Sequence, residues 1–299
     1  MTPLYASANP EAARLAKELA RFAPTSLPLL LEGETGTGKS FLARRIHRRS
    51  RPGQPLVVVD CAAIPETLFP AELFGHTAGA FTDATRSRPG FLQQVREGTL
   101  VLDRVDALSP ASQAALLRVL EEGQYVPLGA TQARSCRARV LALVGPDLLG
   151  KMERGEFRRD LYHRLAGWHA VLLPLRQRRE DILPTARRWL ARKDPALHLT
   201  REAEELLLHY HWPGNFRELV AVLERALVVQ RGSEVGVEAL DFAQWRWEEL
   251  VPHLGPIPLA QAMRVYALFV LAREKGNVSR AARTLGISRR TLIRWRRPS

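Results

Sequence analysis

Cysteine is scarce in this chain, since Cys61 and Cys136 are the only two among 299 residues. Two cysteines provide no disulfide framework, and their separation is not that of a metal-ligand motif. Long hydrophobic runs are missing as well, because no apolar stretch approaches the roughly 20 residues that a membrane-spanning helix needs. These absences favour a protein of a reducing cytoplasm without membrane association, in which both thiols are small core side chains.

An internal repeat and a low-complexity tract are also absent from the sequence, and a targeting segment is not expected. The first residues form an amphipathic helical pattern that contains Glu11 and Glu18, which neither a signal peptide nor a transit peptide would have. The length predicts two domains and leaves ample chain for a sizeable core.

Acidic residues are lacking between Gly276 and Ser299, which supplies about half of the net charge of +13. A basic tail can be merely disordered and solvated, so its internal pattern must decide what it does. The arginines of this stretch are Arg280, Arg283, Arg289, Arg290, Arg294, Arg296 and Arg297.

The pattern GNVSRAARTLGISRRTLIRW predicts two short helices that follow a longer helix, Leu259–Lys275. Gly276 is a natural residue to end the long helix, and Gly286 makes the turn between the short ones. Ser279 and Ser288 are the predicted N-terminal caps. Ala281 and Ala282 are small enough to permit a close helix crossing.

In the last helix Leu292 and Trp295 are predicted to face inward. The pattern therefore predicts a helix-turn-helix whose final helix enters the major groove of double-stranded DNA, with its side chains contacting phosphates or guanine edges. The alternative is a basic amphipathic helix that binds anionic surfaces loosely. The predicted DNA-binding residues are Arg289, Arg290, Thr291 and Arg294.

The stretch GETGTGKS lies between an apolar run, Leu27–Leu31, that predicts a strand and a predicted helix, Phe41–Arg49. Its glycines let the backbone N–H groups curl around an anion at the helix N-terminus. Its lysine can reach the β- and γ-phosphates, and its serine can ligate Mg²⁺. The predicted nucleotide-binding residues are Gly33, Glu34, Thr35, Gly36, Thr37, Gly38, Lys39 and Ser40.

Further strands are predicted at Leu56–Asp60, Thr99–Asp103 and Val140–Val144, separated by helices such as Ser112–Glu122. Alternating strands and helices around a phosphate loop predict an α/β fold, with a parallel sheet covered on both faces.

From Leu175 onward the strand signals stop. Helical spacing predicts a helical subdomain, and Pro252–Pro258 resembles a linker to the terminal helices. The expected boundaries are 1–173, 174–232, 233–257 (linker) and 258–299. The helices of the subdomain are expected at Arg179–Lys193, Thr200–Tyr210 and Asn215–Gln230.

These blocks, taken in order, resemble the AAA+ core of bacterial enhancer-binding proteins, the sigma-54-dependent transcriptional activators, followed by their Fis-type helix-turn-helix. The resemblance rests on GETGTGKS, DCAAIPETLFPAELFGH, GAFTDA, GTLVLD, LLRVLEEGQY, GEFRRDLYHRL, PLRQRREDI and WPGNFREL. It implies a homo-oligomeric ring, usually hexameric, with ATP and Mg²⁺ between subunits. The family's N-terminal sensory domain is expected to be missing.

The resemblance also implies roles for single residues. Asp103 would help to hold Mg²⁺ through water. Arg158 and Arg164 would be arginine fingers that reach into a neighbouring subunit. Arg217 would be the lid arginine that senses the γ-phosphate. For each arginine the alternative is an ordinary surface or interhelical salt bridge.

Two departures from the family pattern concern hydrolysis. Where the family has a glutamate that polarises the attacking water, this chain has Arg104, and a guanidinium cannot accept a proton. Where the family has the asparagine that holds this glutamate, the chain has Asp60. Since the two strand ends should be adjacent, an Asp60–Arg104 ion pair is predicted in place of the catalytic switch. An alternative is that Asp60 or Asp106 serves as the base.

Two further segments also depart from the family. The first sensor, a Thr-Asn pair in the family, is here Val144-Gly145, followed by a proline. The loop that contacts sigma-54 keeps Phe81 and Thr82, but Asp83 replaces a glycine and restricts the backbone.

The sequence leaves three candidate functions for this protein. The first is a sequence-specific DNA-binding transcriptional regulator that binds ATP and hydrolyses it weakly or not at all. The second is an active ATPase that remodels the promoter complex of the sigma-54 RNA polymerase holoenzyme. The third, a P-loop enzyme with an incidental basic tail, conflicts with the helix-turn-helix pattern.

Overall fold

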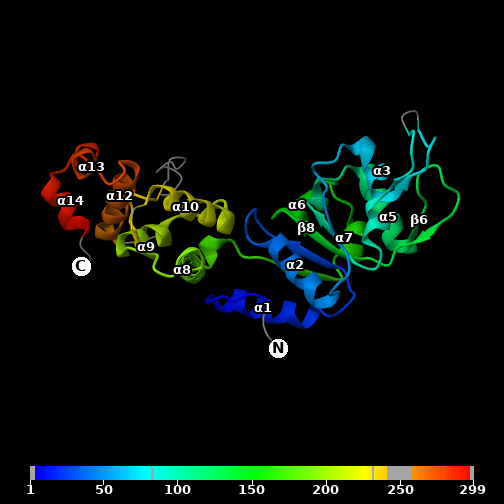
Figure 1. The fold of residues 1–299 in the computed structure, drawn as a ribbon, viewed down its shortest axis with the longest axis horizontal. Helices are drawn as coiled ribbons and strands as arrows, with labels where there is room; N and C mark the ends of the chain where they lie inside the picture. The colour runs from blue at the N-terminus through cyan, green and yellow to red at the C-terminus, as the bar shows by residue number, and fades with distance from the viewer. Residues whose placement is uncertain (1–3, 82–83, 231, 241–257, 297–299) are drawn as a thin grey trace. The chain divides into compact units, whose positions relative to one another are not determined.

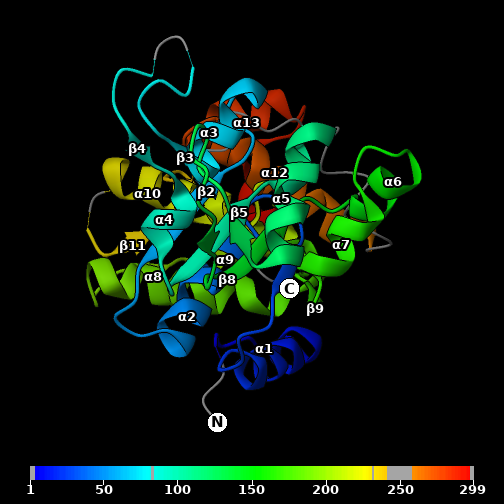
Figure 2. The same cartoon turned by 90° about the vertical axis from the view of Figure 1, so that its right-hand side faces the viewer.

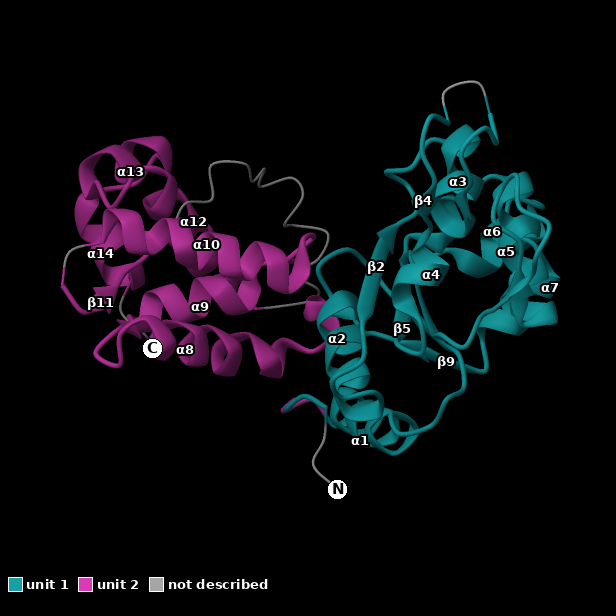
Figure 3. Ribbon diagram, turned by 45° about the vertical axis from the view of Figure 1, so that its right-hand side comes forward, with its two compact units in different colours: residues 1–6, 10–173 teal, residues 7–9, 174–299 magenta. Residues whose placement is uncertain are grey.

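The structure is a computed structural model that describes residues 4–81, 84–230, 232–240 and 258–296. It divides into two compact units, coloured separately in Figure 3. Unit 1 contains residues 1–6 and 10–173, and unit 2 contains residues 7–9 and 174–299. Among the described residues no helix combines the length and the apolar character needed to cross a bilayer.

Unit 1 is built on a five-stranded parallel sheet with the strand order β2-β5-β8-β1-β9. Figure 1 draws the chain as a ribbon and labels β8 of this sheet. The predicted parallel α/β fold is therefore confirmed. The register places Asp60 opposite Asp103, so the carboxyl ends of β2 and β5 lie at one edge. The strands are β1 (Leu29–Glu32), β2 (Leu56–Asp60), β5 (Thr99–Asp103), β8 (Arg139–Val144) and β9 (Trp168–Val171).

Each face of this sheet has its own hydrophobic core, because successive side chains of a strand point to opposite faces. Leu29 and Leu31 pack with α1 (Pro10–Phe22) and α2 (Lys39–Ser50) on one face. Leu30 lies in the core of the other face. The helices of unit 1 that cover the two faces are labelled in Figure 2. That second core includes side chains of α3 (Phe69–Phe74), α4 (Phe91–Val95), α5 (Pro110–Glu122), α6 (Leu148–Glu153) and α7 (Arg159–Leu165).

Two short hairpins and two 3₁₀ turns complete unit 1. The first hairpin carries the loop with Phe81, and it is closed where Gly75 and Gly90 approach so tightly that neither has room for a Cβ atom. The remaining elements are β3 (Gly75–His76) with β4 (Arg88–Pro89), β6 (Gln124–Tyr125) with β7 (Arg134–Ser135), η1 (Glu66–Leu68) and η2 (Val105–Ala107).

Both cysteines lie in unit 1 as free thiols, as the sequence predicted. Cys61 belongs to the core that includes side chains of α3 to α7, and Cys136 packs against the same core. Burial raises the pKa of the Cys61 thiol to about 12.

In its described part unit 2 is mainly helical, and its buried apolar side chains form one hydrophobic core. The expectation that strands stop at Leu175 is wrong, because β10 (His198–Leu199) and β11 (Glu234–Val235) pair in parallel. The backbone N–H groups of His198 and Thr200 donate to Ser233 and Val235 across this pair. The other elements are η3 (Leu175–Gln177), η4 (Arg179–Asp181), α8 (Ile182–Lys193), α9 (Arg201–His209), α10 (Asn215–Val229), α12 (Leu259–Arg273), α13 (Val278–Thr284) and α14 (Arg289–Arg296).

The predicted linker, 233–257, contributes some of its side chains to the hydrophobic core of unit 2. Val235, Val237, Ala239 and Leu240 are all buried in unit 2. The rest of that segment, 241–257, lies outside the described residues, as does most of Pro252–Pro258.

The three terminal helices share the core of the lid helices. Side chains of α12 such as Phe269 are buried with those of α9 and α10. At the edge of this contact, Arg264 Nε donates to Glu205 Oε1 over 2.6 Å.

The caps of the two short helices match the sequence analysis in part. Ser288 Oγ accepts the N–H of Thr291 over 3.0 Å, which confirms this cap. Ser279 is not a cap, since it lies inside α13 and the Asn277 side chain accepts the N–H of Arg280 instead. The turn at Gly286 has a positive φ of 65°, which glycine adopts readily.

Candidate functional site

The loop between β1 and α2 has the shape of an anion cradle. Its glycines adopt φ angles of 153° at Gly33, 79° at Gly36 and 106° at Gly38, which other residues rarely take. A Cβ atom on Gly33 would lie 3.0 Å from the Leu172 carbonyl oxygen. The loop therefore needs glycine both for its backbone angles and for its close packing.

The lysine of the loop curls back over the cradle. Lys39 Nζ donates to the carbonyl oxygens of Gly33 over 2.5 Å and Glu34 over 3.0 Å. Thr37 Oγ1 donates to the same Glu34 carbonyl over 2.8 Å, which tightens the turn. Lys39 and Ser40 form the first turn of α2, so a cation and the positive end of a helix dipole lie together. This arrangement fits the phosphates of a nucleotide.

Ser40 and Asp103 meet beside the cradle. Ser40 Oγ lies 3.5 Å from Asp103 Oδ2, although 63 residues separate them in the chain. Asp103 is the last residue of β5, so the parallel sheet brings it to the edge from which the loop rises. A hydroxyl and a carboxylate are oxygen donors of the kind that Mg²⁺ takes. The residues therefore fit a magnesium ion held beside the phosphates.

The predicted ion pair between Asp60 and Arg104 is present. Arg104 Nε donates to Asp60 Oδ1 over 2.9 Å, and Arg104 Nη2 donates to Asp60 Oδ2, so the contact is bidentate. Hydrogen bonding from the guanidinium is the main cause that lowers the pKa of Asp60 and raises that of Arg104. Both side chains are about half exposed, at 47% and 55%.

Arg104 has a left-handed backbone conformation, which is unusual for a residue other than glycine. Its φ of 55° and ψ of 43° lie in the left-handed region, directly after Asp103 and at the start of η2. Such a conformation is uncommon outside glycine, and it marks strained positions near functional sites.

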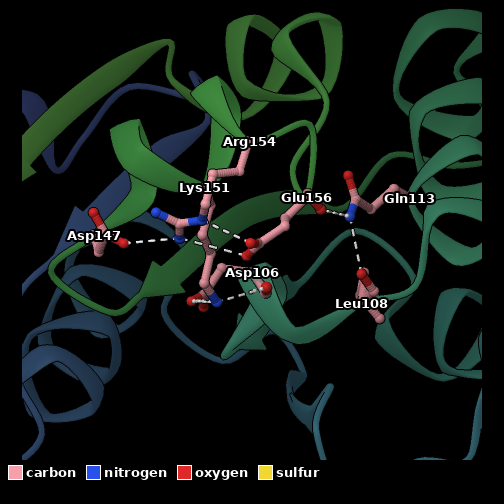
Figure 4. A network of polar contacts seen from close by, with 7 residues as sticks. All are labelled: Asp106, Leu108, Gln113, Asp147, Lys151, Arg154 and Glu156. Carbon is pink, nitrogen blue, oxygen red and sulfur yellow. Dashed lines mark hydrogen bonds and ion pairs between the residues drawn. The ribbon is translucent and has the colours of Figure 1, made fainter.

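Asp106, the other candidate base, is held by a lysine. Lys151 Nζ donates to Asp106 Oδ2 over 2.8 Å and to its carbonyl oxygen over 3.0 Å. Figure 4 shows this contact within a wider network, where Arg154 donates to Asp147 and Glu156. The Asp106 side chain is only 11% exposed, so this carboxylate is engaged within the protein.

The end of β8 offers no polar side chain at the positions of the expected first sensor. Val144 is buried, and Gly145 has no side chain. A Cβ atom at Gly145 would lie 3.5 Å from Asp106 Oδ2.

The arginines proposed as fingers lie at the two ends of α7. Arg158 directly precedes α7 and pairs with Asp160 over 2.7 Å, while Arg164 lies 3.7 Å from Glu121 on α5. Both are about half exposed, and both have the local ion pairs that the alternative interpretation predicts. Arg217 is an exposed residue of α10 in unit 2.

Of the residues proposed to contact sigma-54, Phe81 is described. Its side chain is 42% exposed, and its ring lies 4.9 Å from that of His76 at the base of the loop. Thr82 and Asp83 lie outside the described residues.

A polar chain beneath the phosphate loop was not found from the sequence. Glu32, the last residue of β1, is buried, and its Oε2 lies 2.8 Å from His169 Nε2. The other nitrogen of that ring, Nδ1, lies 3.3 Å from the Tyr162 hydroxyl on α7. The available signal was a glutamate that ends an apolar run directly before the motif.

The last helix presents its basic residues to solvent, as the sequence predicted. Arg289, Arg290 and Arg294 are exposed and Thr291 is half-buried, whereas Leu292 is fully buried. A surface depression of about 430 Å³ is lined by Ser288, Arg290, Thr291, Ile293 and Arg294.

The phosphate loop, the strand order and the helical second unit define a P-loop protein of the AAA+ class, joined to a helix-turn-helix. The chain belongs to the sigma-54 activator family, because residues 5–170, more than half of its length, match the sigma-54 interaction domain. Residues 176–246 match the AAA+ ATPase lid domain, and residues 269–296 match the Fis family of bacterial regulatory proteins.

Known transcriptional regulators are similar to this chain over most of its length. It is 39% identical over 294 residues to the transcriptional regulatory protein ZraR of Klebsiella oxytoca, covering 95% of this chain and 66% of ZraR. It is 45% identical over 229 residues to the nitric oxide reductase transcription regulator NorR2 of Cupriavidus necator, covering 74% of this chain and 44% of NorR2. The chain thus spans slightly less than two thirds of ZraR.

A solved structure has the same fold. NtrX of Brucella abortus in complex with ATP superposes with a TM-score of 0.73 at 28% identity, covering 97% of this chain and 68% of NtrX. Its complex with ADP gives a TM-score of 0.71.

Proposed function

We propose that this chain is a sequence-specific DNA-binding transcriptional regulator that binds Mg-ATP and hydrolyses it slowly or not at all. The observation that carries the proposal is the bidentate Asp60–Arg104 ion pair at the edge where Ser40 meets Asp103. Nucleotide binding and loss of turnover are separate parts of the proposal, and each has its own support.

Nucleotide binding is supported by the intact cradle. Gly33–Ser40 would hold the phosphates with backbone N–H groups and the Lys39 ammonium, while Ser40 and Asp103 would hold Mg²⁺. Bound ATP would supply the negative charge that this cradle is shaped to receive. The ATP complex of NtrX, a protein of the same fold, is consistent with this assignment.

Slow turnover is supported by the state of the candidate bases. Arg104 stays protonated and cannot accept a proton from water. Asp60 is a weak base, because its guanidinium partner depresses its pKa. Asp106 is held by Lys151. Since general bases contribute typically ~10²–10⁴-fold to rate, their absence would leave a slow enzyme.

DNA binding is supported by the exposed arginines of α14. A buried Leu292 fixes this helix on the core and leaves Arg289, Arg290 and Arg294 accessible to phosphates and base edges. Because one recognition helix reads one half-site, we expect at least a homodimer on a roughly palindromic target. Localisation with DNA in the bacterial cytoplasm follows from this role.

A second candidate is an active activator ATPase that engages sigma-54 and assembles as a ring. It is favoured by Phe81, which is exposed on its loop, with Thr82 as its expected partner in the contact. It is favoured also by Arg158, Arg164 and Arg217, which are exposed and so accessible to a neighbouring subunit or a nucleotide. In this function Arg158 and Arg164 would exchange their local carboxylates for the phosphate of an adjacent subunit.

One paired measurement separates the two candidates. Mg-ATP binding by calorimetry and phosphate release should be measured on the same full-length preparation, with and without double-stranded DNA. We expect micromolar-range binding, which Lys39→Ala abolishes, with release near background. Arg118→Ala, which alters a surface pair with Glu122, is the matched control for both readings. Rapid phosphate release that depends on Lys39 would establish the second candidate function. Absence of ATP binding would refute the proposal.

A further inference from the structure

We infer that Arg104 is a phosphate-binding residue specific for nucleoside triphosphates, and that Asp60 is its competitor. In this inference the guanidinium leaves the Asp60 carboxylate when a third phosphate is available. The inference rests on the proposed function, since it requires that the cradle binds nucleotide.

The position of Arg104 places a long basic side chain at the phosphate edge. It follows Asp103, whose Oδ2 lies 3.5 Å from Ser40 Oγ at the start of α2. Its left-handed backbone turns the chain sharply at the end of β5, where Asp60 ends the neighbouring strand. The guanidinium therefore lies at the same edge of the sheet as the proposed magnesium position.

Release of Arg104 from Asp60 requires little rearrangement. Both side chains are about half exposed, and exposed ion pairs contribute little because water and salt compete with them. Asp60 also has a second partner, since its Oδ1 accepts the Ala62 N–H over 3.2 Å. The carboxylate would thus stay hydrogen-bonded and solvated after the guanidinium has left.

A terminal phosphate is a better partner for this guanidinium than Asp60. A phosphate offers more negative charge than a carboxylate and the same bidentate geometry for arginine. The loop backbone would hold the inner phosphates and Lys39 would reach the β- and γ-phosphates, so Arg104 would add a second cationic contact that only a third phosphate can make. Arg104 would then discriminate ATP from ADP, and Asp60 would weaken ATP binding by occupying the guanidinium.

This mechanism predicts opposite effects for the two members of one ion pair. The full chain should be titrated by calorimetry with Mg²⁺ plus a non-hydrolysable ATP analogue, and separately with Mg-ADP. We expect Arg104→Ala to weaken binding of the analogue by about tenfold, with ADP affected less than about twofold, as for loss of one charged hydrogen-bonded contact. Asp60→Asn should tighten the analogue about threefold with ADP unchanged, because a neutral amide no longer competes.

Arg104→Lys supplies a second reading of the same residue. A lysine keeps the charge but not the fork, so affinity for the analogue should fall between wild type and Arg104→Ala. Arg118→Ala, another exposed arginine paired with a carboxylate, should change neither affinity. If Arg104→Ala folds poorly by circular dichroism, Asp60→Asn and Arg104→Lys decide the matter.

The outcomes separate this inference from the proposed function. Equal losses for the analogue and ADP in Arg104→Ala, or weaker analogue binding in Asp60→Asn, would show that the pair is only structural and overturn the inference. If Lys39→Ala still binds both nucleotides like wild type, the nucleotide site itself is misplaced and the proposed function fails with it.

Discussion

Glu32 Oε2 lies within hydrogen-bond distance of His169 Nε2, at 2.8 Å. Glu32 directly precedes the first glycine of the phosphate loop. Glu32 ends β1 and His169 lies on β9, so the pair joins two neighbouring strands of the parallel sheet. The carboxylate is buried, and His169 is its hydrogen-bond partner among the described residues.

His169→Ala should therefore destabilise unit 1 by about 1–3 kcal/mol, the usual cost of leaving a buried polar group unsatisfied. Urea denaturation followed by circular dichroism would measure the free energy of unfolding. Tyr162→Phe is the matched control, because it removes only the longer 3.3 Å contact of the same imidazole. An equal loss of stability in both variants would mean that the Glu32 contact has no special weight.

Replacing the Asp60–Arg104 pair by an amide and a carboxylate should increase ATP turnover. In the single variant Arg104→Glu, the new carboxylate lies beside that of Asp60. The like charges disfavour ionisation of the glutamate, which has to be ionised to act as the base. The double variant Asp60→Asn with Arg104→Glu removes that repulsion and supplies a general base, so phosphate release should rise by at least about tenfold. A coupled phosphate assay would follow it, with Lys39→Ala added as the background control. Turnover unchanged in the double variant would show that the ion pair is not what limits hydrolysis.

The thiol of Cys61 should be inert in the folded protein. Burial raises its pKa to about 12, so at pH 8 the reactive thiolate is only ~10⁻⁴ of the population. Because the folded pKa is raised, burial of the neutral thiol stabilises the protein below the unfolded value of about 8.5. That contribution declines as the pH rises from there toward 12.

A disulfide reagent that reports released thiolate would measure this reactivity between pH 7 and 9. The variant Cys136→Ser isolates Cys61, which should react only after guanidinium is added. Rapid stoichiometric labelling of that folded variant would contradict the burial seen at Cys61.

The arginines of α14 should determine how DNA affinity depends on salt. Each phosphate contact contributes ~0.9 to the slope of log affinity against log salt, so Arg290→Ala with Arg294→Ala should lower the slope by roughly 1–2. Fluorescence anisotropy with a labelled duplex at several salt concentrations gives this slope. Arg192→Ala, an exposed arginine of α8, should leave it unchanged. A slope that stays the same in the double variant would place the DNA contact elsewhere.

The cap of α13 offers a test of local structure. Asn277→Ala should cost about 1 kcal/mol, because it leaves the Arg280 N–H without its side-chain acceptor. Ser279→Ala should change stability by less than about 0.5 kcal/mol, since Ser279 is an exposed residue within the helix. Chemical denaturation of the two variants in parallel would compare them, and a larger effect at Ser279 would reverse the assignment.

The contrast between Ser279 and Asn277 illustrates where sequence reasoning reaches its limit. Both are good capping residues two positions apart, and the pattern of apolar residues does not distinguish the two starts. The pair β10–β11 is not predictable from the sequence for a related reason, because two-residue strands show no periodicity. The proline- and glycine-bearing stretch that follows predicts a linker from residue 233, but four side chains within 233–240 complete the core of unit 2.

Longer-range features were predictable only where strand register determined them. Parallel strands that end together made the Asp60–Arg104 contact foreseeable from the two residues at their ends. The contacts of Glu32 with His169 and of Asp106 with Lys151 join segments whose spacing in the sequence carries no signal. The β1–loop–α2 segment was the easiest to predict, because its glycines, lysine and serine are each required by local backbone geometry.

The shared core of α9, α10 and α12 means that the C-terminal helices of this protein are not a portable module. In a fragment that begins at Leu259, the side chains of Leu268 and Phe269 would be exposed to water. Arg264 would also lose its ion pair with Glu205. A chimera that grafts these terminal helices onto a foreign protein would need to carry the preceding helical segment with them to avoid aggregation.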